Sequence, residues 1–538
     1  MLAKKFTDST QSAWRVTKLF GKNRVILKSL LLSAMLFGCS APEIPKETVE
    51  VATRLGVVEG FRQHEVMHFY GIPYAAPPVG EKRFMAPSPP EAWSGVLAAT
   101  SYANRCLQAE GGLEGEGTPF KEDCLFLNIY TPSVNGEKRP VLFWIHGGGF
   151  TQGSANGYDG SVLAGQGDVV VVTINYRLGF LGFADLSDLG TEFLGSGSNG
   201  IRDQIMALNW VAQNIEDYGG DPANVTIFGE SAGGHSVLGL IAAPAADGLF
   251  HKAIAHSPGI VNLPSQSTVP ALVSKYGVTG QALRERIYSL SAAEIVATQP
   301  NLGISGGRID GTVITRSTVD AILERGEQGV PLIAGTNRDE GTLFSALIPD
   351  TMWPEMEEGL ARMIVAGDPA NYLASVRELY PESDTKYQER IWGDMFRIAA
   401  VGSAQRATQA SPGGWLYRFD LVSTAPVLGE KFGATHGAEI PFTFNSYARS
   451  DNGFPGRTFM GFEVYDPEEE SVSNLANAWS ATVIQFAKYG DPNGAGLPQW
   501  PRYRAEQRRT MVLDQAPRIE ANWEQEELAL WSSVGLSP

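Results

Sequence analysis

Residues 225–234 constrain the fold of this chain more than any other segment. The apolar residues 225–228 favour a β-strand, residues 229–233 read Gly-Glu-Ser-Ala-Gly, and residues 234–241 have the pattern of a helix. A serine on such a sharp strand-to-helix turn stands exposed, and the amides at the start of the helix point toward its substrate. Ser231 is therefore predicted to be a nucleophile at the end of a strand in an α/β sheet. A second match to the spacing, within 303–307, has no apolar strand before it.

Strand-like and helix-like segments alternate along the central part of the chain. Strand candidates are residues 141–145, 169–174, 225–228, 253–256, 331–335 and 415–419, and residues 203–215 show the clearest helical period, with Asn199 or Asp203 as the capping residue. The alternation predicts a large, mostly parallel, twisted sheet with helices on both faces. We expect inserted helices over 344–411. Residues 111–117 and 189–200 are interpreted as loops with room to move, with ordinary surface loops as the alternative for each.

Composition indicates a globular protein with a strongly acidic body. The 538 residues are 43% hydrophobic with 11 Trp, enough for a sizeable core, and we expect a single domain over residues 49–538 with long insertions. The net charge is −17, and because residues 1–38 are basic, the rest is more acidic still. Such a field repels phosphate backbones, so nucleic acid is not an expected partner.

The first 38 residues have the pattern of an export signal. A basic segment precedes an uncharged apolar run that is too short to span a bilayer as a helix. Residues 36–39, Leu-Phe-Gly-Cys, resemble a bacterial lipoprotein cleavage site in which Cys39 would be lipidated, although Phe37 is bulky for that position. Plain cleavage and a retained anchor are the alternatives. Residues 39–48 would be a tether, and we expect the protein in the periplasm, on a membrane through this lipid, or secreted.

Two cysteines remain once Cys39 is assigned to the signal. Cys106 and Cys124 form an even pair in an exported protein, which predicts a disulfide, with two buried thiols as the alternative. Neither lies in a metal-ligand pattern such as Cys-x-x-Cys, so no metal site is predicted.

A serine hydroxyl needs a base, and the usual base is a histidine held by a carboxylate. In a sheet where the nucleophile follows a middle strand, the acid and then the histidine come from later strands. Of the seven histidines, three precede Ser231 and three follow it too closely to leave room for the acid. His436, in a Gly-flanked loop after the strand candidate 415–419, is therefore the predicted base.

The acid is expected at the end of a strand between these two residues. Asp339 and Glu340 both follow such a strand candidate, and the spacing does not choose between them. Asp310 and Asp320 are weaker candidates, because no comparable apolar run leads into either.

Donors for a developing oxyanion are predicted at the three glycines of residues 147–149. They directly follow the strand candidate 141–145, and their unobstructed amides would complement the amide of Ala232, the residue after the nucleophile. A flexible turn is the alternative.

Together these motifs resemble the type B carboxylesterase and cholinesterase family of α/β-hydrolases, in particular its bacterial carboxylesterases. The likeness covers nearly all of the chain after the signal. Its motifs are Gly-Glu-Ser-Ala-Gly at 229–233, His-Gly-Gly-Gly-Phe at 146–150, Glu-Asp-Cys-Leu-Phe-Leu-Asn-Ile-Tyr-Thr-Pro at 122–132 and Gly-Thr-Asn-Arg-Asp-Glu-Gly at 335–341. The resemblance implies the α/β-hydrolase fold and hydrolysis of small-molecule carboxylic esters through an acyl-enzyme, without a metal or an organic cofactor.

The resemblance also implies roles for individual residues. It selects Glu340 as the triad carboxylate, beside Ser231 and His436. The oxyanion donors it implies are the amides of Gly148, Gly149 and Ala232, the disulfide is Cys106 to Cys124, and the structural ion pairs are Arg83 with Glu122 and Arg177 with Asp203. Glu230 and Glu439 match acidic positions near the family's site.

Departures from the family narrow the expected activity. The segment between Cys106 and Cys124 contains no Trp, whereas cholinesterases carry there the Trp that stacks on choline, so a quaternary ammonium substrate is not expected. Tyr218 replaces the family's Phe, a mild change. An amidase, lactonase or lipase on the same machinery remains an alternative. A binding protein that keeps the fold without turnover is disfavoured, because all three triad positions are filled.

Overall fold

A computed structural model of the chain describes residues 46–110, 117–259, 263–302, 306–365, 368–410, 413–424, 431–447, 458–459, 462–463, 465–466, 468–523 and 525–535. All of them belong to one unit, Lys46–Pro538. The predicted export signal, Cys39 and most of the predicted tether lie outside the described residues, as does most of the segment 111–117. No helix within the described ranges is long and apolar enough to cross a membrane.

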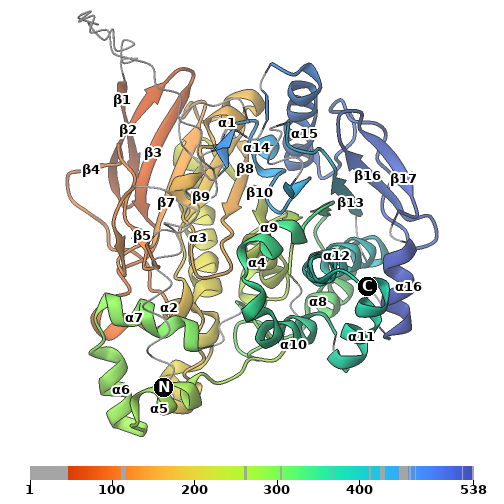
Figure 1. Ribbon diagram of the computed structural model, residues 1–538. Coiled ribbons are helices and arrows are strands. Elements are labelled where there is room, and N and C mark those ends of the chain that lie inside the picture. Colours follow the sequence, from red (N-terminus) through yellow and green to blue (C-terminus); the bar gives the residue numbers. More distant parts are fainter. Residues whose placement is uncertain are drawn as a thin grey trace, which may run out of the picture. The chain divides into compact units, whose positions relative to one another are not determined.

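A 13-stranded sheet runs through this unit (Figure 1). Its order is β1-β2-β3-β7-β9-β8-β10-β11-β12-β13-β16-β17, with β4 beside β2. All neighbours from β9 to β16 are parallel, and the pairs outside them along this order are antiparallel. The strands are β1 (Glu47–Thr53), β2 (Gly56–Gln63), β3 (Val66–Pro73), β4 (Val96–Ala98), β7 (Phe126–Thr131), β8 (Arg139–Ile145), β9 (Val170–Ile174), β10 (Gly220–Glu230), β11 (Lys252–His256), β12 (Leu332–Asn337), β13 (Gly414–Phe419), β16 (Arg509–Leu513) and β17 (Arg518–Ala521). Every strand candidate of the sequence lies in this sheet.

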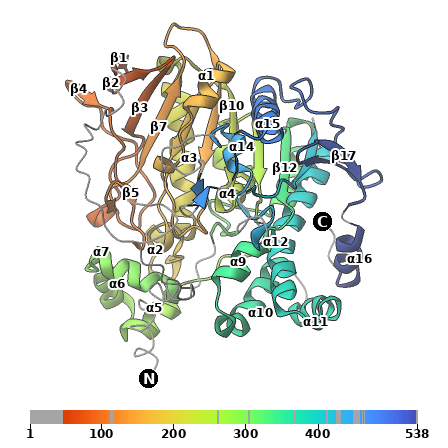
Figure 2. The same ribbon diagram turned by 45° about the horizontal axis from the view of Figure 1, so that its top comes forward.

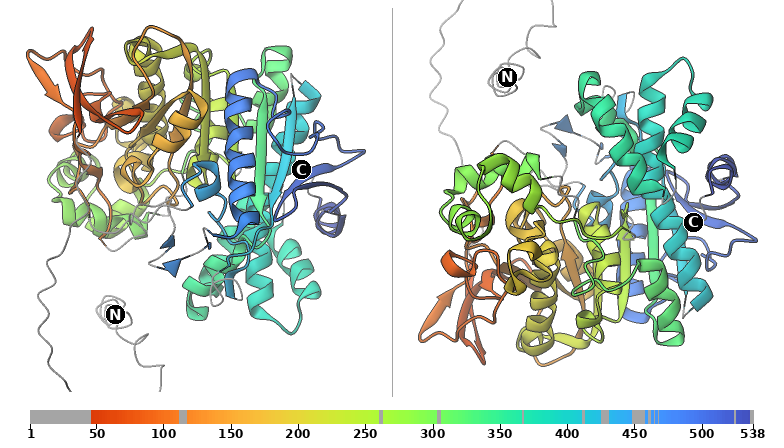
Figure 3. Two further views of the ribbon diagram at one scale, coloured as in Figure 1. Left: turned by 90° about the horizontal axis from the view of Figure 1, so that it is seen from above. Right: turned by 90° about the horizontal axis from the view of Figure 1, so that it is seen from below.

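The middle residues of the central strands are mostly apolar and buried, because helices cover both faces of the sheet (Figure 3). In β8, Val141 and Phe143 pack with the apolar side chains of α3 (Asn199–Asn214) and α4 (Ala232–Ile241). Leu142 and Trp144 pack on the other face with α1 (Ser161–Gly167) and α15 (Glu470–Tyr489). This arrangement confirms the predicted α/β-hydrolase architecture.

Helices between β12 and β13 confirm the insertion expected over residues 344–411 (Figure 2). They are α9 (Gly341–Leu347), α10 (Trp353–Ile364), α11 (Pro369–Leu379) and α12 (Asp384–Ala410). The other α-helices in the described ranges are α2 (Gly179–Phe183), α5 (Val269–Tyr276), α6 (Gly280–Tyr288), α7 (Ala292–Thr298), α8 (Thr318–Arg325), α14 (Ile440–Thr443) and α16 (Gln525–Ser533), and the other strands are the short β5 (Arg105–Cys106), β6 (Phe120–Lys121), β14 (Thr458–Phe459) and β15 (Phe462–Glu463).

The expectation that residues 189–200 form a loop with room to move was wrong for residues 195–200. This segment forms short 3₁₀ turns that lead into α3, and residues 195–200 are buried. Its small residues are needed for close packing, since a Cβ added at Gly200 would lie 2.3 Å from the ring of Phe183. The predicted cap of α3 was also wrong: Ser198 precedes the helix, Asn199 is its first residue, and Asp203 lies inside it.

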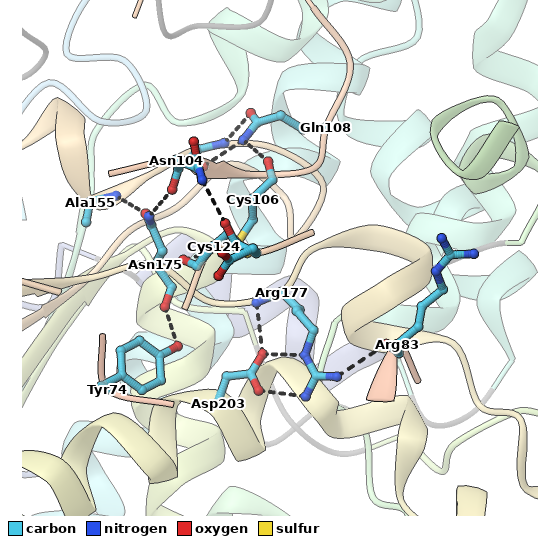
Figure 4. The surroundings of a disulfide bond; sticks show 12 residues. Tyr74, Arg83, Asn104, Cys106, Gln108, Cys124, Ala155, Asn175, Arg177 and Asp203 are labelled. Atoms are coloured by element: carbon cyan, nitrogen blue, oxygen red, sulfur yellow. Dashed lines mark hydrogen bonds and ion pairs between the residues drawn. A yellow bond between two sulfur atoms is a disulfide. The ribbon is translucent and has the colours of Figure 1, made fainter. Parts of the chain in front are cut away.

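Two arginine–carboxylate pairs join distant segments of the chain, and Figure 4 shows one of them, Arg177 with Asp203. Arg177 donates to both oxygens of Asp203 at 2.8 and 2.7 Å, and both side chains are buried. Arg83 donates to both oxygens of Glu122 at 2.7 Å and also to the carbonyl of Leu290 at 2.9 Å. Removing one partner would leave an unpaired charge in the interior, so these pairs are structural.

A disulfide joins Cys106 and Cys124, whose Cα atoms lie 4.9 Å apart (Figure 4). Replacing both cysteines by serine is expected to lower the free energy of unfolding by about 3 kcal/mol, because the bond removes loop-closure entropy from the unfolded chain. Denaturant unfolding of the wild type and the double variant measures the difference. A reductant should destabilise the wild type and leave the double variant unchanged, and equal unfolding midpoints for the two proteins would contradict the prediction.

Candidate active site

Ser231 lies on the turn between β10 and α4. Its φ of 58° falls in the left-handed region, which residues with a side chain rarely adopt. Glycines allow this turn to pack closely, since an added Cβ would lie 2.6 Å from the Ile145 carbonyl oxygen at Gly229 and 2.0 Å from it at Gly233. The Ser231 amide donates to the carbonyl of His256 at 3.0 Å. The turn thus holds a partly exposed serine at the carboxyl end of β10.

Glu340 is fully buried at the end of β12 and contacts the imidazole of His436. Its Oε1 accepts hydrogen bonds from the Ser257 hydroxyl at 2.6 Å and the Asn337 amide at 2.7 Å. Its Oε2 lies 2.6 Å from Nδ1 of His436. Because an ionised carboxylate only accepts, Nδ1 carries a proton in this contact, and Nε2 is the nitrogen left to act as a base.

Asp339, the other acid that the spacing allowed, holds the loop that carries His436. Its amide donates to the carbonyl of Ala434 at 2.9 Å, and its Oδ2 accepts from the amide of Ala434 at 2.9 Å. Oδ2 also pairs with Arg338 at 2.8 Å. The structure therefore brings Glu340 to the imidazole and Asp339 to the backbone beside it.

The two weaker acid candidates serve local turns. Asp310 accepts the amide of Thr312 at 2.7 Å, and the Asp320 amide donates to the Ser317 hydroxyl at the start of α8 at 3.1 Å. Neither pairs with His436, whose carboxylate partners among the described residues are Glu340 and Glu230.

A second carboxylate approaches the other nitrogen of His436. Nε2 of His436 lies 3.0 Å from Oε1 of Glu230. This approach does not have the geometry of a hydrogen bond, and Nε2 makes none with any described residue, including Ser231. Burial alone would lower the pKa of His436, but the carboxylates of Glu230 and Glu340 raise that pKa to about 9. Burial raises the pKa of Glu230, against the opposing charge of His436. Burial also raises the pKa of Glu439, whose Oε2 accepts from the Asn337 side chain at 2.6 Å.

Two phenylalanines from the inserted helices enclose the imidazole. The ring of Phe396, in α12, stacks on His436 with centroids 4.5 Å apart, and the ring of Phe344, in α9, lies 5.0 Å away. These rings limit the movement of the imidazole and remove water from around it. Neither contact is predicted by the sequence, because apolar side chains of an inserted helix have no periodicity that distinguishes a contact with the site from ordinary core packing.

Residues 146–153, here called the glycine loop, lie against the nucleophile. A Cβ added at Gly147 would come within 3.1 Å of Cβ of Ser231. Gly148 and Gly149 have φ angles of 102° and 60°, which glycine adopts without strain. Ala232, which follows Ser231 in sequence and is the first residue of α4, is buried. The loop and the start of α4 therefore reach the region of Ser231 from two sides.

Three other histidines are held neutral, of which His146 and His256 are buried and His235 is half-buried. Burial lowers the pKa of His146 and His235 to about 4 and that of His256 to about 3. Nε2 of His235 donates to the carbonyl of Gly307 at 2.9 Å, and Nδ1 of His256 lies 2.7 Å from the Tyr417 hydroxyl. Within the described ranges, no group of three or more His, Cys, Asp or Glu could hold a metal ion.

The family model of the carboxylesterase family matches residues 47–531, nearly the whole described unit. The chain belongs to the carboxylesterase family. Para-nitrobenzyl esterase of Bacillus subtilis is 36% identical to it over 495 residues, which cover 89% of this chain and 97% of that protein. Human cocaine esterase is 35% identical and is covered over 87% of each chain. A solved thermophilic PNB esterase has a TM-score of 0.80 at 34% identity and covers 89% of this carboxylesterase and 99% of its own chain.

Membership of this family settles the class of the protein. It is a serine carboxylesterase, a carboxylic ester hydrolase with the α/β-hydrolase fold, as the resemblance of its motifs implied.

Proposed function

We propose that this carboxylesterase hydrolyses small-molecule esters through an acyl-enzyme formed on Ser231, with His436 as general base and Glu340 as its orienting carboxylate. The contact that carries the proposal is the 2.6 Å approach of Glu340 Oε2 to Nδ1 of His436. This contact leaves Nε2 of His436 to take a proton, and the proton comes from the hydroxyl of Ser231 in the Gly-Glu-Ser-Ala-Gly motif. Glu340 stays ionised and stabilises the imidazolium that forms.

The reaction needs Nε2 to turn from Glu230 to Ser231. Catalytic hydrogen bonds often tighten only when substrate is bound, so we infer that the Ser231 hydroxyl meets Nε2 in the substrate complex. Nε2 takes the hydroxyl proton while Oγ attacks the ester carbonyl. The resulting oxyanion is held by the amides of Gly148, Gly149 and Ala232.

Collapse of this tetrahedral intermediate breaks the bond to the alcohol oxygen, which leaves with the proton from Nε2. A water molecule then gives a proton to Nε2 and attacks the acyl carbonyl. Breaking the bond to Ser231 Oγ, which regains its proton, releases the carboxylic acid.

Labelling with a fluorophosphonate probe tests the nucleophile directly. The probe phosphonylates activated serines, and mass spectrometry should find it on the peptide that contains Ser231. Labelling of a different serine, or no labelling of an active preparation, would refute the assignment. Turnover of a p-nitrophenyl ester series of increasing acyl length, beside the corresponding anilide, separates a carboxylesterase from a lipase or an amidase.

The pH dependence of kcat/KM should respond to Glu230, because the base works only when His436 is neutral. The Glu230 carboxylate stabilises the protonated imidazole, so Glu230→Gln should lower the pKa of His436 and move the acidic limb of the profile to lower pH by about one to three units. Glu439→Gln is the matched control: its carboxylate contributes least among the three to the pKa of His436, and its shift should be smaller. An acidic limb that stays in place in Glu230→Gln would contradict this prediction.

Export of the protein is part of the same proposal. It is supported by the signal pattern of residues 1–38, by the Cys106–Cys124 disulfide, and by a 34% identical duck fatty acyl-CoA hydrolase that is named as a precursor. Mass spectrometry of the mature N-terminus tests it: a diacylglyceryl group on Cys39 that is lost in Cys39→Ala would establish a lipid anchor, and an intact residue 1 would refute processing.

A further inference from the structure

Gln108, shown beside Cys106 in Figure 4, connects the disulfide to the glycine loop of the active site. This side chain lies two residues after Cys106 and is only 4% exposed. Its Nε2 donates to the carbonyl of Gly153 at 2.9 Å, and its Oε1 accepts from the amide of Gly153 at 2.9 Å. Nε2 also donates to the carbonyl of Cys106 at 3.0 Å. One buried amide is thus paired with both backbone groups of a residue on the glycine loop and is itself held by a disulfide cysteine.

Gly153 is the residue at which the glycine loop closes on itself. Its φ is 106°, and an added Cβ would lie 2.5 Å from Nδ1 of His146 and 2.6 Å from the carbonyl oxygen of Gly147. Within the loop, the carbonyl of Gly148 accepts from two later amides at 3.1 Å each. A displacement of Gly153 would therefore be passed to the backbone of residues 147–149, where the oxyanion donors lie.

We infer that Gln108 is a positioning residue for the oxyanion donors, and that the Cys106–Cys124 disulfide holds it in that role. The inference rests on the proposed function, because it concerns amides assigned there to Gly148 and Gly149. Preorganised donors stabilise the transition state only when they are already aimed at the developing charge, and a misplacement of about 1 Å can cost about 10²-fold in rate. Gln108 acts on the reaction only through Gly153.

The experiment compares two variants of Gln108 with a matched control. Gln108→Ala removes the whole amide, and Gln108→Glu keeps its size but loses the donor to the Gly153 carbonyl. The control is Asn104→Ala: Asn104 lies two residues before Cys106, as Gln108 lies two residues after it, but its side chain donates to the carbonyl of Asp123 at 3.2 Å. With a p-nitrophenyl ester, both Gln108 variants should lower kcat by about 10- to 100-fold with KM changed less than about 3-fold. Asn104→Ala should keep the wild-type kcat.

Inhibitor binding separates positioning from a general structural effect. The Ser231 oxygen adds to the carbonyl of a trifluoromethyl ketone while its proton passes to His436, which gives a hemiketal oxyanion, whereas the alcohol product of the ester binds without one. Affinity for the ketone should fall by the same factor as kcat in the Gln108 variants, and affinity for the alcohol should stay at the wild-type value. A folded Gln108→Glu variant with wild-type kcat, or equal losses of affinity for both ligands, would overturn the inference.

The role of the disulfide is tested by combining variants. Cys106→Ser with Cys124→Ser should lower kcat without changing KM, and adding Gln108→Ala should cost less than the product of the separate losses, because both break the same link. Multiplicative losses would overturn the part assigned to the disulfide. Fluorophosphonate labelling of the wild type separates the two proposals: failure to label Ser231 overturns both, and normal labelling with unaffected Gln108 variants overturns only this inference.

Discussion

Ser231→Ala is expected to lower kcat by roughly 10⁶-fold with ester substrates. The alanine has no oxygen to attack the carbonyl, and His436 then has no serine proton to accept. His436 and Glu340 therefore lose their contribution to the rate together with Ser231. What remains is the stabilisation that the backbone donors give to attack by water. Activity should be measured with enough protein to detect residual turnover, and the initial burst of p-nitrophenol should disappear, because no acyl-enzyme forms.

Stability measurements keep this prediction separate from misfolding. Alanine and serine experience the same strain at the φ of 58°, so the variant should melt at the wild-type temperature. Ser236→Ala is the control, since this buried serine of α4 accepts a hydrogen bond from Gln204 at 2.9 Å and has no assigned role in the reaction. Esterase activity of Ser231→Ala within about 100-fold of the wild type would contradict a nucleophilic Ser231.

The sequence predicts those features of this molecule that depend on residues close to one another along the chain. Parallel strands buried on both faces appear as apolar runs, and the change from strand to helix around Ser231 is read directly from residues 225–241. The choice of His436 also follows from sequence, because chain order excludes the other histidines.

Contacts that depend on the folded backbone could not be predicted in the same way. Asp339 and Glu340 are adjacent in sequence, and only the pairing of Asp339 with the loop before His436 turns one carboxylate to the backbone and the other to the imidazole. Phe344 and Phe396 reach the imidazole from an insertion whose helix directions are not encoded in local pattern. The approach of Glu230 to His436 likewise depends on how two loops meet.

Glycine and serine content was misleading for a physical reason. In residues 189–200 this content predicts a loop with room to move. Gly200 is instead needed because α3 begins against the ring of Phe183, which leaves no space for a larger side chain. The same residue type therefore marks an open loop or a crowded backbone, and composition does not distinguish the two.

The second large effect is expected from Glu340→Gln, which should lower kcat by about 10⁴-fold near neutral pH. Oε1 of Glu340 accepts from two donors, the Ser257 hydroxyl and the Asn337 amide. A glutamine must place its oxygen there, so its NH₂ group would face Nδ1 of His436. Nδ1 would then have to accept, the proton would move to Nε2, and Nε2 could no longer take the proton of Ser231.

Asp339→Asn is the matched control for this substitution, because the two acids are adjacent and the sequence alone does not separate them. Its oxygen can still accept the amide of Ala434, while the ion pair with Arg338 is lost. We expect a lower melting temperature and a kcat within about 10-fold of the wild type, since the imidazole keeps its carboxylate. Losses of kcat in the opposite order, with Asp339→Asn the more severe, would mean that the rate depends on anchoring the His436 loop and not on the tautomer that Glu340 selects.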